Sequence, residues 1–480
     1  MTSRRRGALV AASALVAASL AAACSTSSDV VAGSARQPVP STTALATTTT
    51  PPTTAPPTTA ALPDGPDPVE PDPHRPSQPF DKVLAAELND IQAFWTDAFP
   101  TIYGKPYTPL AGGIWAVFPR SQRVPGCGQP QTSYNDIRGN AFYCAQGDFV
   151  AFDDQELFPK IYAKFGPFIL GMVLGHEWGH AIQQRAAATN QPTILLEQQA
   201  DCFAGAWMGH LQDGASPYLR PSDGDLNSAF AGMVTFSDAP GTTADQQQAH
   251  GSGFDRIGAF QDGYVNGPKA CAAYPDKPPT VIELPLTPTD QQTGGNMAYA
   301  DMLPAASKDL DRFWGSVLAS KGQTYTTPAG GVRPFPSDGP YPSCGAVAVK
   351  AEIVAYCPTQ DAIVYDDGFL SGPVYEIGDF AVGILIGNAW SAAMQTRLHD
   401  TVAGTARSLQ GNCLTGAWAG DILTNPDQSR QFYLSAGDLD EGLTALLRYG
   451  GSDAAASGTV FDRIASFRKG LLQGTAACGL

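Results

Sequence analysis

Residues Leu174–Arg185 read LGHEWGHAIQQR, and this short stretch decides how the rest of the chain is interpreted. It places two histidines four positions apart, with a glutamate directly after the first. On an α-helix, positions i and i+4 share one face, so His176 and His180 can direct their imidazole rings at one point. Glu177 then lies beside that point, which suits a zinc-activated water and a carboxylate that takes its proton. Because the pattern is short, two packed histidines and an acid that fall in this order by chance are the alternative.

The residues around this motif predict a helix from Pro167 to about Ala187. Proline is favoured in the first turn of a helix, where its missing N–H costs no hydrogen bond. Both histidines and the glutamate would therefore be carried by one helix. Apolar residues follow the proline at helical spacing: Phe168, Ile169, Met172, Val173 and Ile182.

The chain also contains a long internal repeat. IGNAWSAAMQTR, Ile386–Arg397, has the spacing of the first motif but lacks its histidines and glutamate. Other blocks recur in the same order: YCAQGDFVAFDD returns as YCPTQDAIVYDD, ADCFAGAW as GNCLTGAW, and FDRIGAF as FDRIASF. The offset between the copies stays between 207 and 219 residues. This agreement predicts two homologous domains, residues 80–275 and 300–480, joined by a linker at 276–299.

The composition narrows the class of partner. The formal net charge of −16 argues against nucleic acid, because binding phosphates requires a basic face. The length of 480 residues and a hydrophobic content of 43% suffice for more than one core. We therefore expect a folded, acidic protein that binds no nucleic acid.

Apart from Cys24, the chain has eight cysteines, which lie at matching positions of the two copies, four in each. An even number in an exported chain favours disulfides, although four cysteines allow three pairings and four thiolates could also hold a structural zinc. We favour pairing the first two and the last two cysteines of each copy, because the first two bracket a predicted hairpin. The favoured bonds are Cys127–Cys144, Cys202–Cys271, Cys344–Cys357 and Cys413–Cys478.

The N-terminus has the features of an export signal. Three arginines precede an apolar stretch that is too short for a membrane span, which predicts a signal peptide over residues 1–23. LAAAC, Leu20–Cys24, resembles a bacterial lipobox, in which Cys24 receives a lipid; ordinary secretion with cleavage nearby is the alternative. Residues 24–79 are rich in Thr and Pro, like the stalks of actinobacterial surface lipoproteins, and predict a tether. We expect a membrane lipoprotein of the cell envelope, outside the cytoplasm.

A zinc site built on His176 and His180 needs a third ligand from another helix. Glu197 opens the segment EQQADCFAGAW, 17 residues after His180. Asp201 follows one helical turn later, where its carboxylate can orient a ligand histidine and set its tautomer. The sequence thus offers a complete candidate site within a short span.

The second copy lacks this whole set of residues. If the histidines served packing, both copies would need them, yet only the glycines, cysteines and large aromatic residues are kept. The joint loss indicates that the set forms one chemical unit, separable from the fold. The replacements for His176, Glu177, His180, Glu197 and Asp201 are Asn388, Ala389, Ala392, Ser408 and Asn412.

HEWGH, EQQADCFAGAW and HGSGFDRIGAFQDGY together resemble the putative neutral zinc metallopeptidase family, within the gluzincin type to which thermolysin belongs. The resemblance covers most of residues 80–275. It implies a Zn2+ cofactor held by His176, His180 and Glu197, with Glu177 as general base. Trp178 departs from the small aliphatic residue expected at its position. The expected fold class is α+β: two homologous zincin-like domains, each a small antiparallel sheet packed against the active-site helices.

The predicted function is that of a surface-tethered endopeptidase that hydrolyses a peptide or protein substrate through a zinc-activated water. The strand-like residues 148–154 could bind an extended peptide by edge pairing, or form an internal strand. A non-catalytic zinc-binding recognition or scaffold lipoprotein is the alternative, because binding and catalysis share their ligands. The second domain is expected to bind a cell-envelope partner or to brace the first domain.

His250 is a further candidate for a catalytic role. It lies in AHGSGFDRI, just before a predicted helix that Ser252 can cap, with Asp255 three residues further on. The second copy has Ser457 in place of this histidine, within the same recurring block. By the same resemblance, His250 would donate a hydrogen bond to the oxyanion of the tetrahedral intermediate. A capping or packing histidine is the alternative.

Overall fold

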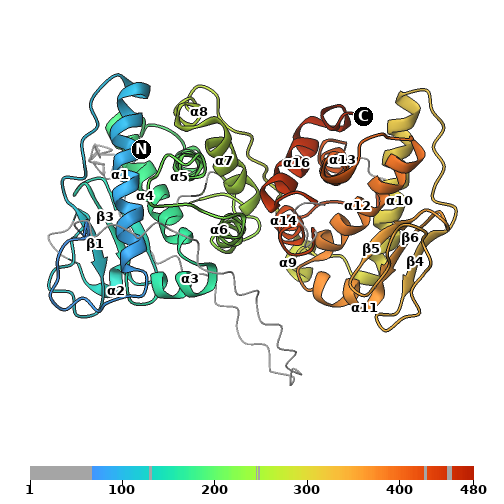
Figure 1. Ribbon diagram of the computed structural model, residues 1–480, viewed down its shortest axis with the longest axis horizontal. Helices are drawn as coiled ribbons and strands as arrows, with labels where there is room; N and C mark the ends of the chain where they lie inside the picture. The colour runs from blue at the N-terminus through green and yellow to red at the C-terminus, as the bar shows by residue number, and fades with distance from the viewer. Residues whose placement is uncertain (1–66, 129–131, 245, 247–248, 426–429, 451–456) are drawn as a thin grey trace, which may run out of the picture.

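The computed structural model describes residues 67–480 apart from 129–131, 245, 247–248, 426–429 and 451–456. The predicted signal peptide, Cys24 and most of the predicted tether lie outside these residues. Within the described part of the chain, no helix is both long and apolar enough to cross a membrane. Figure 1 shows two lobes side by side, the first coloured blue to green and the second yellow to red. We refer to residues 67–275 as the first lobe and to residues 288–480 as the second lobe.

The first lobe combines helices with one small sheet, which gives a mixed α and β architecture. Its helices are α1 (Asp81–Tyr103), α2 (Tyr134–Ile137), α3 (Leu157–Phe165), α4 (Phe168–Ala186), α5 (Thr193–Gln212), α6 (Asp223–Thr235), α7 (Gly253–Asn266) and α8 (Pro268–Ala272). Its strands are β1 (Ile114–Val117), β2 (Ala141–Cys144) and β3 (Phe149–Asp153).

The second lobe has a similar order of elements. Its main helices are α9 (Pro288–Thr293), α10 (Tyr299–Ser320), α11 (Asp367–Phe369), α12 (Asp379–Arg397), α13 (Gly404–Thr424), α14 (Asp438–Tyr449) and α16 (Val460–Gln473). Its strands are β4 (Gly331–Phe335), β5 (Val354–Cys357) and β6 (Ala362–Asp366). Helix α9 lies inside the segment predicted to be a linker.

Each lobe holds a three-stranded sheet with the same arrangement. β3 lies between a parallel neighbour, β1, and an antiparallel neighbour, β2, and β6 lies in the same way between β4 and β5. The prediction of purely antiparallel sheets is therefore wrong. A parallel pair needs a long crossover between its strands, and the connection from β1 to β3, which includes α2 and β2, provides one.

The central position of β3 decides between the two roles considered for residues 148–154, an edge for peptide binding and an internal strand. All five residues of β3 are buried, and both of its sides are paired with neighbouring strands. No backbone edge is left for a peptide, so these residues form an internal strand. The edge strand on the side of helix α4 is β2, which packs against that helix.

Helix α4 runs from Phe168 to Ala186, as the position of Pro167 and the apolar spacing predicted. It packs against α5 at small residues. A Cβ atom added to Gly179 would lie only 2.7 Å from the Cα atom of Ala200. The two helices can therefore approach closely enough for side chains from both to reach a common point.

The structure contains the four disulfides favoured from the sequence, two in each lobe. The reason given for the first of them is wrong, because Cys127 lies in a loop and α2 separates it from Cys144. The hairpin in this region joins β2 to β3, and its turn begins only after Cys144. The bond instead ties the preceding loop to the edge strand.

The two lobes meet through helices rather than through their sheets. Helices α6 and α7 of the first lobe pack against α14 and α16 of the second, in the middle of Figure 1. Phe230 of the first lobe stacks on Phe461 of the second, with 5.7 Å between the ring centroids. Gln261 Nε2 donates to the carbonyl oxygen of Phe461 at 3.0 Å.

Candidate metal centre

Helices α4 and α5 bring the three predicted ligands together. One donor atom each of His176, His180 and Glu197 lies within 4.8 Å of the other two. His176 Nε2 lies 3.2 Å from His180 Nε2 and 3.1 Å from Glu197 Oε2. His180 Nε2 lies 3.5 Å from Glu197 Oε1. The histidines share one face of α4, and the close packing of α5 supplies the carboxylate.

The hydrogen bond at Nδ1 of each histidine ring determines whether Nε2 of that ring carries a lone pair. His176 Nδ1 lies 2.7 Å from Asp201 Oδ1, and His180 Nδ1 lies 3.0 Å from Gln183 Oε1. Carboxylate and amide oxygens only accept hydrogen bonds, so each Nδ1 atom carries a proton and each neutral ring presents an Nε2 lone pair. Both lone pairs therefore point toward the Glu197 carboxylate.

Three groups of acceptor atoms facing one another are stabilised by protons or by a cation between them. Glu197 Oε2 is buried and has no hydrogen-bond partner among the described residues, although it lies beside His176. Two imidazole nitrogens and a carboxylate are a donor set typical of catalytic zinc, which keeps a further coordination position open. The residues present therefore fit the zinc ion that the sequence predicted.

The electrostatics of the site favour positive charge at the same place. Burial lowers the pKa of His176, but the carboxylates of Asp201 and Glu197 outweigh burial and raise this pKa to about 10. Burial raises the pKa of Glu197, but His180 and His176 outweigh it, and the result lies well below the ordinary value. The carboxylate is therefore ionised, and the histidines hold either protons or a metal ion.

A second carboxylate behind the site holds the first histidine. Asp201 Oδ1 accepts from His176, and the guanidinium of Arg256 pairs with both oxygens of Asp201, at 2.8 Å from Nε and 2.9 Å from Nη2. Burial raises the pKa of Asp201, whereas Arg256 and His176 lower it, to about 2 overall. Asp201 is thus ionised and lies where it can orient His176, as its assigned role requires.

Glu177 lies between the metal centre and the edge of the sheet. Its Oε2 accepts a hydrogen bond from the backbone N–H of Tyr143 in β2, at 2.9 Å. Burial raises the pKa of Glu177, His176 and His180 lower it, and the net shift is upward. A carboxylate with a raised pKa is a better proton acceptor near neutral pH, which suits a general base.

His250 lies at the rim of the site. Its Nε2 is 3.9 Å from Glu197 Oε2, and its Nδ1 is 3.3 Å from Asp238 Oδ1. The backbone N–H of His250 also donates to Asp238 Oδ2 at 2.7 Å. Ser252 caps α7 as expected, with its hydroxyl accepting from the N–H of Asp255 at 3.1 Å. The imidazole is only partly buried and can face a bound substrate.

Three contributors to the site were missed from the sequence: Tyr143, Gln183 and Arg256. Gln183 had a detectable signal, because it lies three residues after His180 on the same helix and is kept in the second copy as Gln395. Arg256 belongs to the recurring FDRI block, but nothing in that block indicates its partner. The Tyr143 contact uses a backbone N–H, which has no signature in a sequence.

The equivalent place in the second lobe holds neutral side chains. Asn388 Oδ1 accepts from the hydroxyl of Thr415 at 2.7 Å, and the hydroxyls of Ser391 and Thr415 lie 3.3 Å apart. Among the described residues, no set of candidate metal ligands lies at the positions that match His176, His180 and Glu197. The second lobe therefore satisfies its polar atoms locally and leaves no set of converging acceptors there.

The second lobe has a different group of ionisable side chains. One oxygen each of Asp379, Asp438 and Glu441 lies within 4.8 Å of the others, and none forms an ion pair with a described basic residue. Burial and the neighbouring carboxylates raise the pKa of Glu441 to about 9, and burial raises that of Asp379 to about 6. These acids therefore hold protons at pH values where exposed acids are ionised.

Comparison with known proteins shows which family the first lobe resembles. Residues 74–274 match the family described as "Putative neutral zinc metallopeptidase". This region of the chain is similar to that family. The match contains every residue of the candidate metal centre and ends before the second lobe begins.

Two similar relatives carry only general names. "Uncharacterized protein MT2651" of Mycobacterium tuberculosis is 29% identical over 218 residues, which are 40% of this chain and 69% of the relative. "Uncharacterized protein YpfJ" of Escherichia coli is 27% identical over 220 residues, 41% of this chain and 70% of the relative. No solved structure matches the chain significantly.

Proposed function

We propose that the protein is a zinc-dependent endopeptidase whose first lobe hydrolyses peptide bonds. The observation that carries this proposal is the convergence of three lone-pair donors, His176, His180 and Glu197, on one point beside Glu177. The family of residues 74–274 supports the same chemistry. His176, His180 and Glu197 would hold the zinc ion, with Asp201 and Gln183 orienting the two histidines.

When bound, zinc supplies a Lewis acid that lowers the pKa of a water and polarises a carbonyl. The chain supplies the proton transfers. Glu177, with its raised pKa, takes the proton of the attacking water and passes it to the leaving amine. Its hydrogen bond from Tyr143 holds the carboxylate in place before substrate arrives. His250 donates to the oxyanion from the rim of the site.

The substrate proposal now rests on β2 instead of β3. β2 is the edge strand next to α4, and Tyr143 near its end contacts Glu177. An extended peptide added along this edge would gain main-chain hydrogen bonds and would pass beside the general base. This arrangement suits an unfolded segment of a peptide or protein as substrate.

We also propose that the protein acts at the outer face of the cell membrane. The signal-like residues 1–23, the lipobox-like Leu20–Cys24 and the Thr- and Pro-rich segment support a tethered lipoprotein. The test is fractionation of cells that produce the Cys24→Ala variant. Release of that variant from the membrane fraction supports the anchor, whereas continued membrane association contradicts it.

The decisive experiment on function changes Glu177 to Gln. Because Glu177 is not one of the proposed ligands, Glu177→Gln should keep one zinc per chain while kcat on a peptide library falls roughly 100- to 10,000-fold, the range for loss of a general base. Zinc content by atomic spectroscopy and hydrolysis with and without chelator are measured on the same sample. Unchanged hydrolysis in the variant would contradict the proposal.

The same variant separates the enzyme from a second candidate function, a zinc-binding scaffold. The supporting observation for a scaffold is the second lobe, which keeps its fold without the candidate ligands. A cellular role that survives Glu177→Gln but is lost in His176→Ala would favour zinc-dependent recognition. A role lost in both variants favours hydrolysis.

A further inference from the structure

Helix α7 of the first lobe is capped by a residue of the second lobe. Asp440, in the first turn of α14, accepts the backbone N–H of Gly253 on Oδ2 at 2.9 Å and that of Phe254 on Oδ1 at 2.8 Å. The first N–H groups of a helix have no partner within the helix, and a negative charge there is favoured by the helix dipole. The cap inside the lobe is Ser252, whose hydroxyl accepts the N–H of Asp255.

The capped turn lies between two parts of the candidate metal centre. Arg256, three residues after Gly253, pairs with the Asp201 carboxylate that orients His176. His250, three residues before Gly253, is held by Asp238 at the rim of the site. A shift of the first turn of α7 would therefore move both the support of a proposed ligand and the proposed oxyanion donor.

Asp440 also reaches the other end of the His250 loop. The hydroxyl of Ser237 lies 3.2 Å from Asp440 Oδ2, and Arg256 Nη1 donates to the carbonyl oxygen of Phe236 at 3.0 Å. Ser237 and Gly253 flank the loop that carries Asp238 and His250. One carboxylate of the second lobe thus contacts both ends of this loop.

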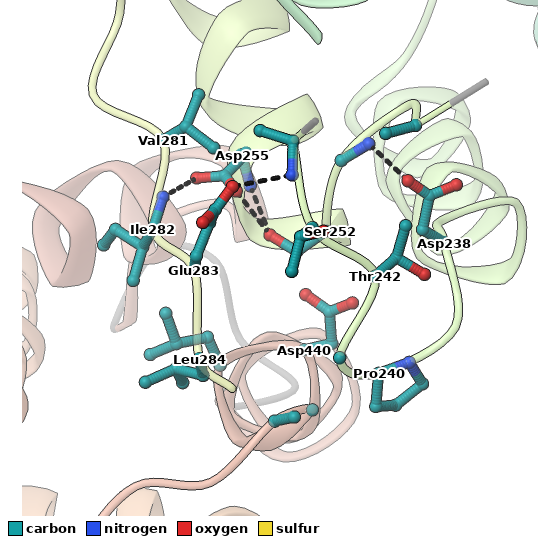
Figure 2. A pocket seen from close by; sticks show the side chains of 18 of the residues that line it. Asp238, Pro240, Thr242, Ser252, Asp255, Val281, Ile282, Glu283, Leu284 and Asp440 are labelled. Carbon is teal, nitrogen blue, oxygen red and sulfur yellow. Dashed lines mark hydrogen bonds between the residues drawn. The ribbon is translucent and has the colours of Figure 1, made fainter. Parts of the chain in front are cut away.

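Figure 2 shows this junction from nearby. Asp440 projects from a helix of the second lobe toward Asp238 and Ser252 of the first lobe, and together they line a cavity of ≈ 60 Å³. Residues Val281–Leu284, which follow the first lobe, close another side of the cavity. The backbone N–H of Ile282 donates to Asp255 at 3.1 Å, so this segment also supports α7.

No described residue of the first lobe caps α16 in the way that Asp440 of the second lobe caps α7. Helix α16, the counterpart of α7, is capped by its own lobe: Thr459 and Asp462 form a reciprocal capping box. The counterpart of Asp440 is Asn227, because SDGDLN and SAGDLD align on Ser222 and Ser435, which make equivalent turns. Among the described residues, no hydrogen bond joins Asn227 to α16. Within the described part of the chain, the cap across the interface is found at α7, the helix next to the candidate metal centre.

We infer that the second lobe positions the candidate metal centre through Asp440. Asp440 is a positioning residue: it touches neither the proposed ligands nor the general base, and acts by holding the first turn of α7. Arg468 supports the same turn, since it donates to the carbonyl oxygen of Phe254 and its guanidinium lies 4.1 Å from the centre of the Phe254 ring. The second lobe thus contributes to the site by supporting helix α7. The kinetic part of this inference rests on the proposed function, and the structural part does not.

The test compares Asp440→Ala with Gln261→Ala in the full chain. Gln261 is the counterpart of Arg468 and makes a hydrogen bond across the same interface, away from the His250 loop. Asp440→Ala should speed amide hydrogen exchange in residues 249–258 by about tenfold, the factor that loss of one helix cap gives in a local opening equilibrium. Gln261→Ala should leave that exchange unchanged.

Kinetics and zinc retention provide the second readout. Asp440→Ala should keep one zinc, release it faster to a chelator, and lower kcat on a peptide substrate by about tenfold with KM nearly unchanged, since positioning affects the reacting geometry more than binding. Asp440→Asn, which keeps one acceptor oxygen, should fall between Ala and the parent protein. If Asp440→Ala does not fold, Asp440→Asn provides the test of the positioning role of Asp440.

Two results would overturn the inference. One is unchanged exchange and unchanged zinc release in a folded Asp440→Ala protein. The other is an equal effect of Gln261→Ala, which would make the interface a general brace without a specific positioning contact. If the zinc-loaded parent protein hydrolyses no peptide, the proposed function fails, and hydrogen exchange and zinc release still decide the role of Asp440.

Discussion

Trp178 in the first lobe and Trp390 in the second occupy equivalent places and make the same contact. The indole N–H of Trp178 donates to the hydroxyl of Tyr107 at 2.8 Å, and that of Trp390 to the hydroxyl of Tyr325 at 3.1 Å. The expected small residue at position 178 is replaced here by a tryptophan that both lobes use. This tryptophan is therefore explained by packing rather than by the chemistry of the metal centre.

Other buried contacts repeat in the same manner. Gln183 donates to the carbonyl oxygen of Leu196 at 2.6 Å, and Gln395 donates to that of Arg407 at 2.9 Å. The repeated contacts join the two central helices of each lobe. The comparison thus separates residues that hold the helices together from residues that serve the candidate site alone. Gln183 belongs to both groups, because its other amide atom accepts from His180.

The buried position of Arg463 in the second lobe is explained by comparison with Arg256 in the first lobe. Arg463 is the counterpart of Arg256 and is buried, but the partner Asp201 is replaced by Asn412. Arg463 donates to two backbone carbonyl oxygens, and its Nε has no partner among the described residues. Burial lowers the pKa of Arg463. The second lobe has the arginine but not the carboxylate that it would pair with.

The largest expected difference between the lobes concerns zinc binding. Glu197→Ala removes one of three converging donors, so zinc affinity should fall by more than the 10- to 100-fold loss that follows removal of an outer partner. Ser408→Ala, the matched change in the second lobe, should have no effect on zinc content. Equilibrium zinc binding to both full-length variants is the measurement. Equal affinities would show that the lobes do not differ as described.

The next largest effect is the loss of kcat expected when His250 is replaced. If His250 stabilises the oxyanion, His250→Ala should keep zinc and fold but lower kcat roughly 100- to 1,000-fold, the loss expected for one such donor. The control is Ser457→Ala at the matching position of the second lobe, which should leave kcat unchanged. A His250→Ala variant with normal kcat would place His250 in the scaffold, and loss of zinc would make it a ligand.

A smaller effect is expected for restoring the lost carboxylate. Asn412→Asp should pair with Arg463 and raise the free energy of unfolding by roughly 1.5–3 kcal/mol, the range for a hydrogen bond to a charged group. Thermal and denaturant unfolding of the full chain measure the change. Asp201→Asn is the mirror change in the first lobe and should destabilise the protein. A destabilised Asn412→Asp protein would mean that the second lobe has rearranged around the neutral side chain.

The last prediction concerns the acids of the second lobe. The folded pKa of Glu441 is raised to about 9, above its ordinary value, so the folded state binds the proton more tightly than the unfolded chain. Stability should therefore fall as pH rises between the ordinary glutamate pKa of about 4.3 and about 9. Glu441→Gln should flatten this dependence of the melting temperature on pH, and Asp223→Asn, at an exposed acid of α6, should not. A parent protein that becomes more stable as pH rises, and further with calcium, would show that these carboxylates hold a cation.

Much of the candidate site could be predicted from the sequence because its geometry is local. The i, i+4 spacing places His176 and His180 on one face of a helix, and the repeat supplies a comparison that singles out Glu197 and Asp201. The strand order could not be predicted in this way. Nothing in the period of residues 148–154 says which strands pair with them, so both an edge strand and an internal strand remained open.

The sequence by itself determined the internal repeat and the candidate residues for the metal ligands and the general base. These follow from residue spacing and from differences between two copies of one pattern. Tertiary structure alone decided that Arg256 supports Asp201, that the N–H of Tyr143 faces Glu177 and that Asp440 caps α7 from the other lobe. These contacts join residues far apart in the chain, often through backbone atoms, and backbone atoms are the same in every sequence. Only the packing of the helices determines which of them meet.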